Sequence, residues 1–258
     1  MELMTAVNHG AHVQASRERE SSIIGTLHPL DAAAVRASGQ RVLLPAGATL
    51  ARPGQALDVV WFPEDAIVSL ADGHAGNRHA DLGLIGPEGL VGWQLLLGDR
   101  TVMARCTVEL AGGHALAVDA DAMLRLCAAR PALNAALLSF VSRFCGQVAR
   151  TLSATLHTQP DVRLARWLLL YHDRLEGDVL AITHQRLADL LGVRRATVTD
   201  WLHLMEGERL LRCTRGRVVV RDREGLIRLA GTAYGGVRGS LAAARIAALS
   251  GSADLPLP

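Results

Sequence analysis

Lysine is absent from this chain of 258 residues: all 27 of its strongly basic residues are arginine. Acidic side chains nearly balance them, which leaves a formal net charge of +2. A molecule with so small a net charge is not a polycation, so any surface that binds nucleic acid must be local. Arginine suits bidentate contact with phosphates and guanine edges. A GC-rich genome, whose codons favour arginine, explains the same absence.

Cysteine and long apolar runs are also scarce. The four cysteines form no CxxC pair and no zinc-site spacing. The N-terminus lacks the apolar segment of a signal peptide. No uncharged apolar run reaches the roughly 18 residues that a membrane helix needs. These absences predict a cytoplasmic protein with reduced thiols and no membrane partner. Half of the chain is nevertheless hydrophobic, which is enough for a folded core.

The sequence predicts neither a metal site nor a cofactor. A haem or metal role for His74, His79 or His114 stays open beside the simpler interpretation that these are surface histidines. Enzyme activity is not expected either. No nucleophile with a base and no paired carboxylates emerge, and the glycines from Gly86 to Gly92 lack the Lys-Ser/Thr of a phosphate loop.

The texture of the chain changes twice. Between Arg41 and Asp119, short apolar runs alternate with turn signals such as Pro53-Gly54, a pattern typical of a small β-barrel or jelly roll. Asp119 can cap a helix, and Pro131 begins a longer one that Pro160 ends. A short helix is also expected around Ser22 to Ser38, ahead of the strands. The expected strands are Arg41–Leu44, Leu57–Phe62, Ala66–Leu70, Arg78–Ile85, Thr101–Leu110 and His114–Val118.

Apolar residues recur on the long helix at alternating steps of three and four. They form a seam of Leu138, Val141, Cys145, Val148 and Leu152. Such a seam fits either packing on the barrel or pairing with a second copy of the chain, and the pattern alone leaves both open.

The stretch from Ile182 to Asp222 predicts a winged helix-turn-helix. Thr183 can cap a first helix, Gly192 ends it, and a second helix follows with the arginines at its start. A basic hairpin, the wing, then turns at Arg215-Gly216. Since the N-terminal end of such a second helix enters the major groove, the expected DNA-binding residues are Thr183, Gln185, Arg194, Arg195, Thr197, Thr199, Arg215 and Arg217. Arg174, Arg186 and Arg212 are expected to extend the same positive surface.

These residues resemble the Crp/Fnr superfamily of bacterial regulators. The similarity is carried by Arg163-Leu-Ala-Arg-Trp-Leu-Leu, by Leu187-Ala-Asp-Leu-Leu-Gly-Val-Arg-Arg-Ala-Thr-Val-Thr, and by Arg215-Gly-Arg-Val-Val-Val-Arg. A Gly-x-Glu-Gly-x-x-Gly motif at Gly86 to Gly92 is similar to one branch of the superfamily.

The resemblance implies an α+β chain: an N-terminal β-roll like a cyclic-nucleotide-binding jelly roll, a long dimerisation helix and a C-terminal winged helix-turn-helix. It implies a homodimer that regulates transcription from a two-fold-related site in double-stranded DNA, with RNA polymerase as a further partner. The expected divisions are a tail at 1–21, the β-roll at 22–118, linker and dimerisation helix at 119–158, the DNA-binding domain at 159–234 and a tail at 235–258. A short helix at Leu241–Leu249 fits the last segment.

The recognition run Arg195-Ala-Thr-Val-Thr-Asp departs from the family's Arg-Glu-Thr-Val-Gly-Arg type. Ala196 and Asp200 replace an acidic and a basic residue, so a different site preference follows. These two residues also support an alternative, a ligand-sensing interaction protein with a vestigial DNA head.

The effector is unidentified from the sequence. Nucleotide-binding members carry a Gly-Glu-Leu motif followed by an Arg-Ser/Thr-Ala phosphate cradle, whose match here is incomplete. The candidate effector residues are Glu88, Gly89, Arg100 and Thr101. A cyclic-nucleotide-responsive regulator therefore stays an alternative.

Overall fold

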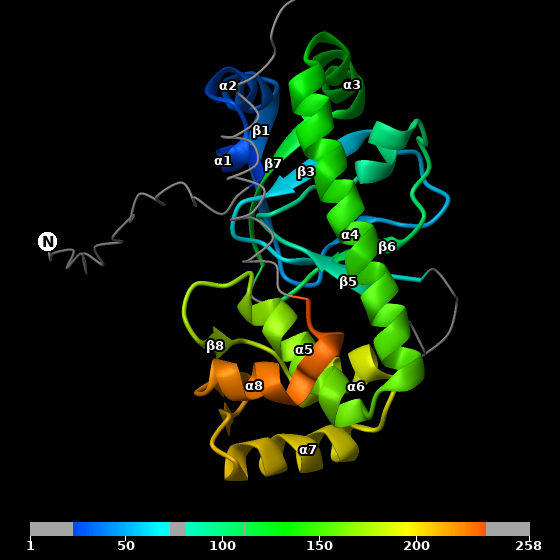
Figure 1. The fold of residues 1–258 in the computed structure, drawn as a ribbon. Helices are drawn as coiled ribbons and strands as arrows, with labels where there is room; N and C mark the ends of the chain where they lie inside the picture. The colour runs from blue at the N-terminus through cyan, green and yellow to red at the C-terminus, as the bar shows by residue number, and fades with distance from the viewer. Residues whose placement is uncertain (1–22, 73–80, 111, 236–258) are drawn as a thin grey trace, which may run out of the picture.

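The structure is a computed structural model and describes residues 23–72, 81–110 and 112–235. A β-roll occupies one end of the molecule and a helical domain the other, and one long helix, α4, runs along both (Figure 1). The expected N-terminal tail at 1–21 lies outside the described residues, as do residues 236–258 of the expected C-terminal tail with its Leu241–Leu249 helix, and His74 and His79. The α+β architecture expected from the sequence is confirmed.

The β-roll is built from two antiparallel sheets. One has the order β1-β7-β3 and the other β2-β6-β4-β5. The strands are β1 Gly39–Leu44, β2 Thr49–Ala51, β3 Val59–Pro63, β4 Val68–Ala71, β5 Asp81–Ile85, β6 Arg105–Val108 and β7 Gly113–Asp119. Each expected apolar run overlaps a strand. In the Thr101–Leu110 run the strand is shorter than expected, since β6 covers only Arg105–Val108. Strand β2 and the 3₁₀ helix η1, Trp93–Leu97, were not expected.

Two short helices, α1 Ile23–Thr26 and α2 Pro29–Ala37, occupy the position where one helix was expected. The chain leaves the roll through α3 Ala120–Ala129, and the Asp119 carboxylate accepts the Ala122 N–H at 2.8 Å as its cap. The helix α4, Pro131–His157, follows with proline in its first turn. Its 27 residues extend about 40 Å.

The roll's core lies between the two sheets and α4. Phe140 and Phe144 of α4 project into it, and the Phe144 ring is 5.8 Å from the Trp93 ring of η1. Burying such an aromatic side chain stabilises the fold by about 1.5–3 kcal/mol. One face of α4 is therefore committed to the β-roll.

The helical domain has its own core and a three-stranded sheet of order β8-β10-β9. Its helix α8 was not expected from the sequence, although Asp222 caps it by accepting the Gly225 N–H at 2.8 Å. The elements are α5 Pro160–His172, β8 Val179–Leu180, α6 His184–Leu191, α7 Arg195–Gly207, β9 Leu211–Thr214, β10 Arg217–Val220, α8 Arg223–Ala230 and η2 Gly231–Ala233.

The two halves are packed together. Ile67 and Leu84 of the roll are buried in the core of the helical domain. The backbone between α4 and α5 consists of Thr158 and Gln159 alone. The position of the helical domain is thus decided by side-chain contacts around a short connection.

Candidate nucleic-acid interface

Helices α6 and α7 form the expected helix-turn-helix. The Thr183 hydroxyl accepts the Arg186 N–H at 3.1 Å, which caps α6. Gly192 ends α6 with a φ of 66°, a left-handed conformation that glycine adopts without steric cost. Val198 and Leu202 of α7 are fully buried against α6 and the rest of the domain core.

The start of α7 is open to solvent. Arg194, Arg195 and Ala196 are exposed, while Thr197 is half-buried. Asp200 is exposed one turn further along. In Figure 1, α7 lies at the end of the molecule farthest from the β-roll, and no described element covers its outer side. A guanidinium at the first turn of such a helix can reach base edges in a major groove.

Thr199 makes an interaction that the sequence did not predict. Its hydroxyl lies 2.9 Å from His184 Nδ1 and 3.1 Å from the Arg195 carbonyl oxygen. Burial lowers the pKa of His184, and the positive charges of Arg195 and His203 lower it further. Thr199 thus ties α7 to the start of α6. The contact joins two single polar residues 15 positions apart, and no apolar periodicity or capping pattern in the sequence predicts such a pair.

The wing is the hairpin β9–β10, which turns at Arg215-Gly216. Arg212, Arg215 and Arg217 are all exposed along it. The Glu206 carboxylate at the end of α7 accepts the Cys213 N–H of β9 at 3.2 Å. This bond and the short connection between α7 and β9 place the basic wing beside α7.

Gln185 is exposed near the N-terminus of α6, and its side-chain amide donates to Asp189 at 2.8 Å. Thr183, which precedes it, is exposed as well. Both residues therefore face solvent at a helix end, where backbone N–H groups favour a phosphate.

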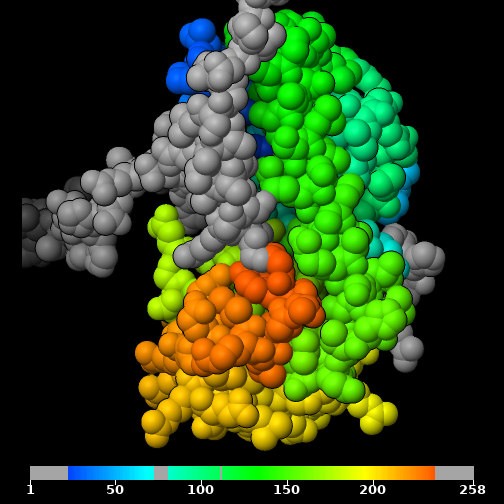
Figure 2. Space-filling view, viewed as in Figure 1, coloured from blue at the N-terminus to red at the C-terminus, as the bar shows by residue number. Residues whose placement is uncertain are grey.

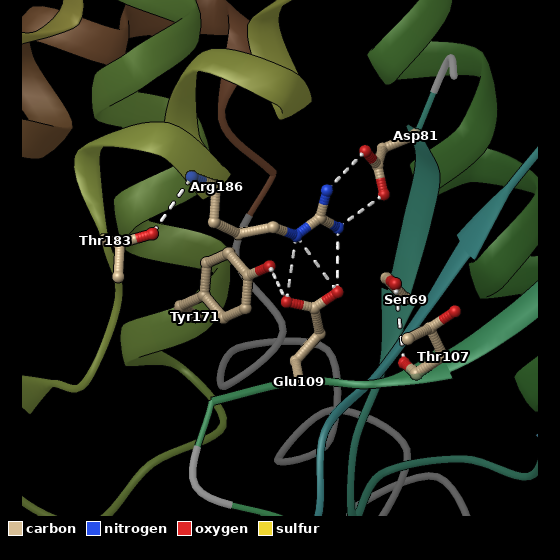
Figure 3. Close-up of polar contacts among 7 residues, drawn as sticks. All are labelled: Ser69, Asp81, Thr107, Glu109, Tyr171, Thr183 and Arg186. Atoms are coloured by element: carbon tan, nitrogen blue, oxygen red, sulfur yellow. Dashed lines mark hydrogen bonds and ion pairs between the residues drawn. The ribbon is translucent and has the colours of Figure 1, made fainter. Parts of the chain in front are cut away.

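Arg174 and Arg186 do not extend this surface, so that expectation was wrong. Arg174 is 3% exposed, and its guanidinium donates to Glu88 at 2.8 Å. Arg186 turns toward the β-roll and binds Asp81 and Glu109 (Figure 3). Although burial disfavours its charge, hydrogen bonds with Asp81 and Glu109 raise the pKa of Arg186. The sequence could not show this because both carboxylates are remote in the chain.

A family model described as a Crp-like helix-turn-helix domain matches residues 162–229. The chain carries a Crp-like helix-turn-helix domain. A CRP-like cAMP-activated global transcriptional regulator from Mycobacterium tuberculosis is 26% identical over 219 residues, which cover 81% of this chain and 96% of that relative. A cyclic AMP receptor protein from Thermus thermophilus is 28% identical over 185 residues, covering 71% and 84%.

Solved structures share the fold of about three quarters of the chain. A CRP-family transcriptional regulator from Thermus thermophilus has a TM-score of 0.62 at 19% identity, covering 76% of this chain and 98% of its own. The c-di-GMP responsive global regulator CLP from Xanthomonas campestris has a TM-score of 0.60 at 19% identity, covering 75% and 99%. The match to the Crp-like domain and the two relatives, one of them a transcriptional regulator by name, support a relationship to the Crp/Fnr superfamily, and the solved structures show that the fold is shared.

The candidate effector residues take separate positions in the β-roll that precedes the Crp-like domain. Glu88 is buried and paired with Arg174. A Cβ on Gly89 would lie 2.2 Å from the Phe140 ring, so this backbone packs directly on α4. Arg100 is exposed and pairs with Asp121, and Thr101 bridges to Ala56. Glu88 and Arg100 have different partners, so among the described residues the four candidates form no shared phosphate cradle.

The α4 seam is divided between two environments. Val141 is buried, and Leu138 and Val148 pack partly against the core of the β-roll. Cys145 is exposed, and Leu152 is 61% exposed. Figure 2 shows α4 as a continuous ridge along the visible face, with its lower half not covered by other described elements on that side. Leu156, one turn beyond Leu152, is 66% exposed and extends the open apolar strip.

The described residues contain no cluster of three or more histidine, cysteine or acidic side chains suited to a metal ion. His114 contacts the Asp65 carboxylate. By length and composition, α4 alone among the described helices could cross a membrane, but the residues of its inner face pack on the β-roll.

Proposed function

We propose that the protein is a homodimeric, sequence-specific regulator of transcription that binds a two-fold-related DNA site. The observation that carries this proposal is the exposed, arginine-rich first turn of α7 beside the basic wing. Arg195 and Thr197 read bases, and Arg194 lies beside them on the groove. Arg215 and Arg217 bind phosphates from the wing. Such a regulator works in the cytoplasm and contacts RNA polymerase.

Thr183, Gln185 and Thr199 have smaller roles in this proposal. Thr183 and Gln185 present the N-terminal end of α6 to a phosphate. Thr199 sits one turn inside α7, where its hydroxyl is already bonded to the protein. Its methyl group remains able to contact a thymine methyl.

The second copy of the chain pairs along α4. Cys145 and Leu152 form, with the half-exposed Leu138 and Val148, an apolar strip that remains accessible on the single chain, whereas Val141 is buried against the β-roll. Burying one leucine side chain contributes about 1.5–3 kcal/mol, and pairing two strips supplies this contribution twice. A symmetric pair of α4 helices would place two recognition helices in the relation that a two-fold site needs.

A cyclic-nucleotide-responsive regulator is the second candidate, and the names of the M. tuberculosis and T. thermophilus relatives favour it. The charges of this chain argue against it. Glu88 is already neutralised by Arg174. A cavity of ≈ 420 Å³ in the β-roll is large enough for a small ligand. Its described lining includes Asp58 and Gln94 but no arginine for a phosphate.

Selection from a randomised double-stranded DNA library tests the proposal. The wild type should enrich a two-fold sequence, and the double variant Arg194→Ala, Arg195→Ala should enrich none. Arg228→Ala is the matched control, because Arg228 is an exposed arginine of the same domain on α8. It should select the wild-type site. If the wild type returns an unselected library, the alternative of a vestigial DNA head replaces this proposal.

A further inference from the structure

A compact group of charges joins the β-roll to the Crp-like domain. Asp81 comes from β5 and Glu109 follows β6, whereas Arg186 comes from α6 and Tyr171 from α5. Figure 3 shows the Arg186 side chain extending between the two carboxylates. We call Arg186, Asp81 and Glu109 the interdomain triad.

The triad is densely hydrogen-bonded. The two terminal nitrogens of Arg186 donate to the two oxygens of Asp81 at 3.0 and 2.8 Å. Its Nε donates to Glu109 at 3.0 Å, and Nη2 donates to the same carboxylate at 2.7 Å. The Tyr171 hydroxyl donates to Glu109 at 3.2 Å. Paired charge-assisted bonds of this kind fix direction as well as distance.

Burial makes this contact specific. The Asp81 side chain is 1% exposed and that of Glu109 is 6% exposed, while Arg186 is 27% exposed. Withdrawing Arg186 would leave two like charges buried side by side, which is strongly unfavourable. The neighbouring apolar contacts of Ile67 and Leu84 tolerate sliding, whereas a two-carboxylate cradle accepts the guanidinium in one orientation.

The triad lies where the orientation of the DNA-binding domain is decided. Only Thr158 and Gln159 connect α4 to α5. If α4 pairs with a second copy, the angle between α4 and the helical domain sets the separation of the two α7 helices. That separation must match half-sites about one helical turn, roughly 34 Å, apart.

We propose that Arg186 is a positioning residue: through Asp81 and Glu109 it holds the DNA-binding domain on the β-roll, so that the two recognition helices are preset for a two-fold site. This inference rests on the proposed function. In this docked position no described element covers the outer side of α7, so the triad leaves that side open to DNA. The triad restricts the orientation of the DNA-binding domain before DNA is bound. Binding to both half-sites therefore costs less conformational entropy.

Glu109→Gln tests the proposal, because it removes one charge and keeps the shape of the side chain and the contact of Arg186 with Asp81. Affinity is measured for the full two-fold site selected by the wild type and for a duplex with one half-site. The full-site affinity should fall about tenfold, the factor that ~1.4 kcal/mol of lost preorganisation gives, and the half-site affinity should change by less than about twofold. An equal loss on both duplexes, or a gain on the full site, overturns the proposal.

Glu64→Gln is the matched control, because it removes a carboxylate that pairs with Arg41 at 2.6 Å on the exposed surface of the same roll. It should leave both affinities unchanged. If Glu64→Gln lowers full-site affinity as much as Glu109→Gln does, the effect belongs to the charge of the roll and the triad proposal fails.

A measurement without DNA separates failure of the triad from failure of the proposed function. In hydrogen exchange on the purified full chain, Glu109→Gln should lower protection in α6 and β6 while the β9–β10 pairing stays protected. Unchanged protection in α6 overturns the proposal even if the wild type binds DNA.

The double variant Arg186→Gln, Glu109→Gln should melt at a higher temperature than Arg186→Gln alone, because it removes one of the two buried carboxylates that Arg186→Gln leaves without a cation. A lower melting temperature for the double variant contradicts the triad.

Discussion

At the scale of residues, Arg195 and Arg215 offer DNA two different kinds of contact. Arg195 opens a helix whose exposed side can enter a groove, so its guanidinium can pair with guanine O6 and N7. Arg195→Ala should lose about 1–3 kcal/mol of discrimination at one base pair of each half-site and keep its non-specific affinity. Competition binding against single-base variants of the selected site measures this. An unchanged preference at every position would refute the assignment of Arg195.

Arg215 sits at the turn of the wing, where we expect it to contact DNA phosphates rather than base edges. Arg215→Ala should weaken binding to all sequences alike and reduce the slope of log K against log salt by about one unit. Titrations at two or more salt concentrations measure the slope. A change of site preference with an unaltered slope would place Arg215 in the groove instead of on the phosphates.

We expect His184 to make the stability of the helical domain depend on pH. Burial and the charges of Arg195 and His203 lower its pKa in the folded state. Protonation is therefore easier in the unfolded chain, whose histidine titrates near pH ~6.5. The stability linked to neutral His184 is complete above that pH and is lost as the pH falls below it.

His184→Gln should accordingly melt with a smaller drop between about pH 7.5 and pH 5.5 than the wild type, because the glutamine does not titrate. Thermal unfolding at the two pH values measures the drop. The exposed residue His157 provides the control variant His157→Gln, which should retain the wild-type drop. A drop in His184→Gln as large as in the wild type would show that the contact with Thr199 is insensitive to protonation.

At the scale of elements, α4 carries two apolar faces on one helix. Its inner face is filled by the β-roll, and its outer strip contains Cys145 and Leu152. If two α4 helices pair in parallel along this strip, the two Cys145 residues face each other across the two-fold axis, within the distance that a disulfide spans. Mild oxidation should give a cross-linked dimer on non-reducing gels, and Cys145→Ser should prevent it. A monomer under these conditions would contradict the α4 pairing.

Leu152→Asp tests the same pairing without disturbing the monomer, because Leu152 is 61% exposed on the single chain whereas Val148 also packs on the roll. The charge should weaken dimerisation strongly, since an aspartate would have to be desolvated in the interface. Sedimentation at micromolar concentration measures the association. The adjacent exposed residue gives the control Ser153→Asp, which should remain dimeric.

At the scale of the whole molecule, a response to cyclic nucleotides can be tested on the intact chain. Cyclic AMP and cyclic GMP should leave the melting temperature unchanged, because the described lining of the roll cavity offers no arginine to a phosphate. A ligand at about 100 times its dissociation constant would otherwise add roughly 2.7 kcal/mol to the free energy of unfolding. Differential scanning fluorimetry with either nucleotide checks this. A saturable upward shift would favour the cyclic-nucleotide-responsive candidate.

The local elements were determined by the sequence itself. Thr183, Gly192 and Asp119 mark helix ends because their preferences for caps and turns act over three or four residues. The alternation of apolar residues likewise predicted a strand in each run of the roll. The short elements β2 and η1 were not predicted, because three to five residues are too few to show an apolar periodicity.

Only the tertiary structure decided which arginines are exposed and which bind carboxylates of the same chain. Arg186 and Arg195 are indistinguishable by residue type, and both lie on amphipathic helices of the same motif. One is held by Asp81 and Glu109, which are 105 and 77 positions away, and the other is exposed. Periodicity and capping report interactions within one turn or one hairpin, so they cannot identify a partner brought close by the docking of two domains. Whether an arginine faces DNA or binds its own chain depends on that docking.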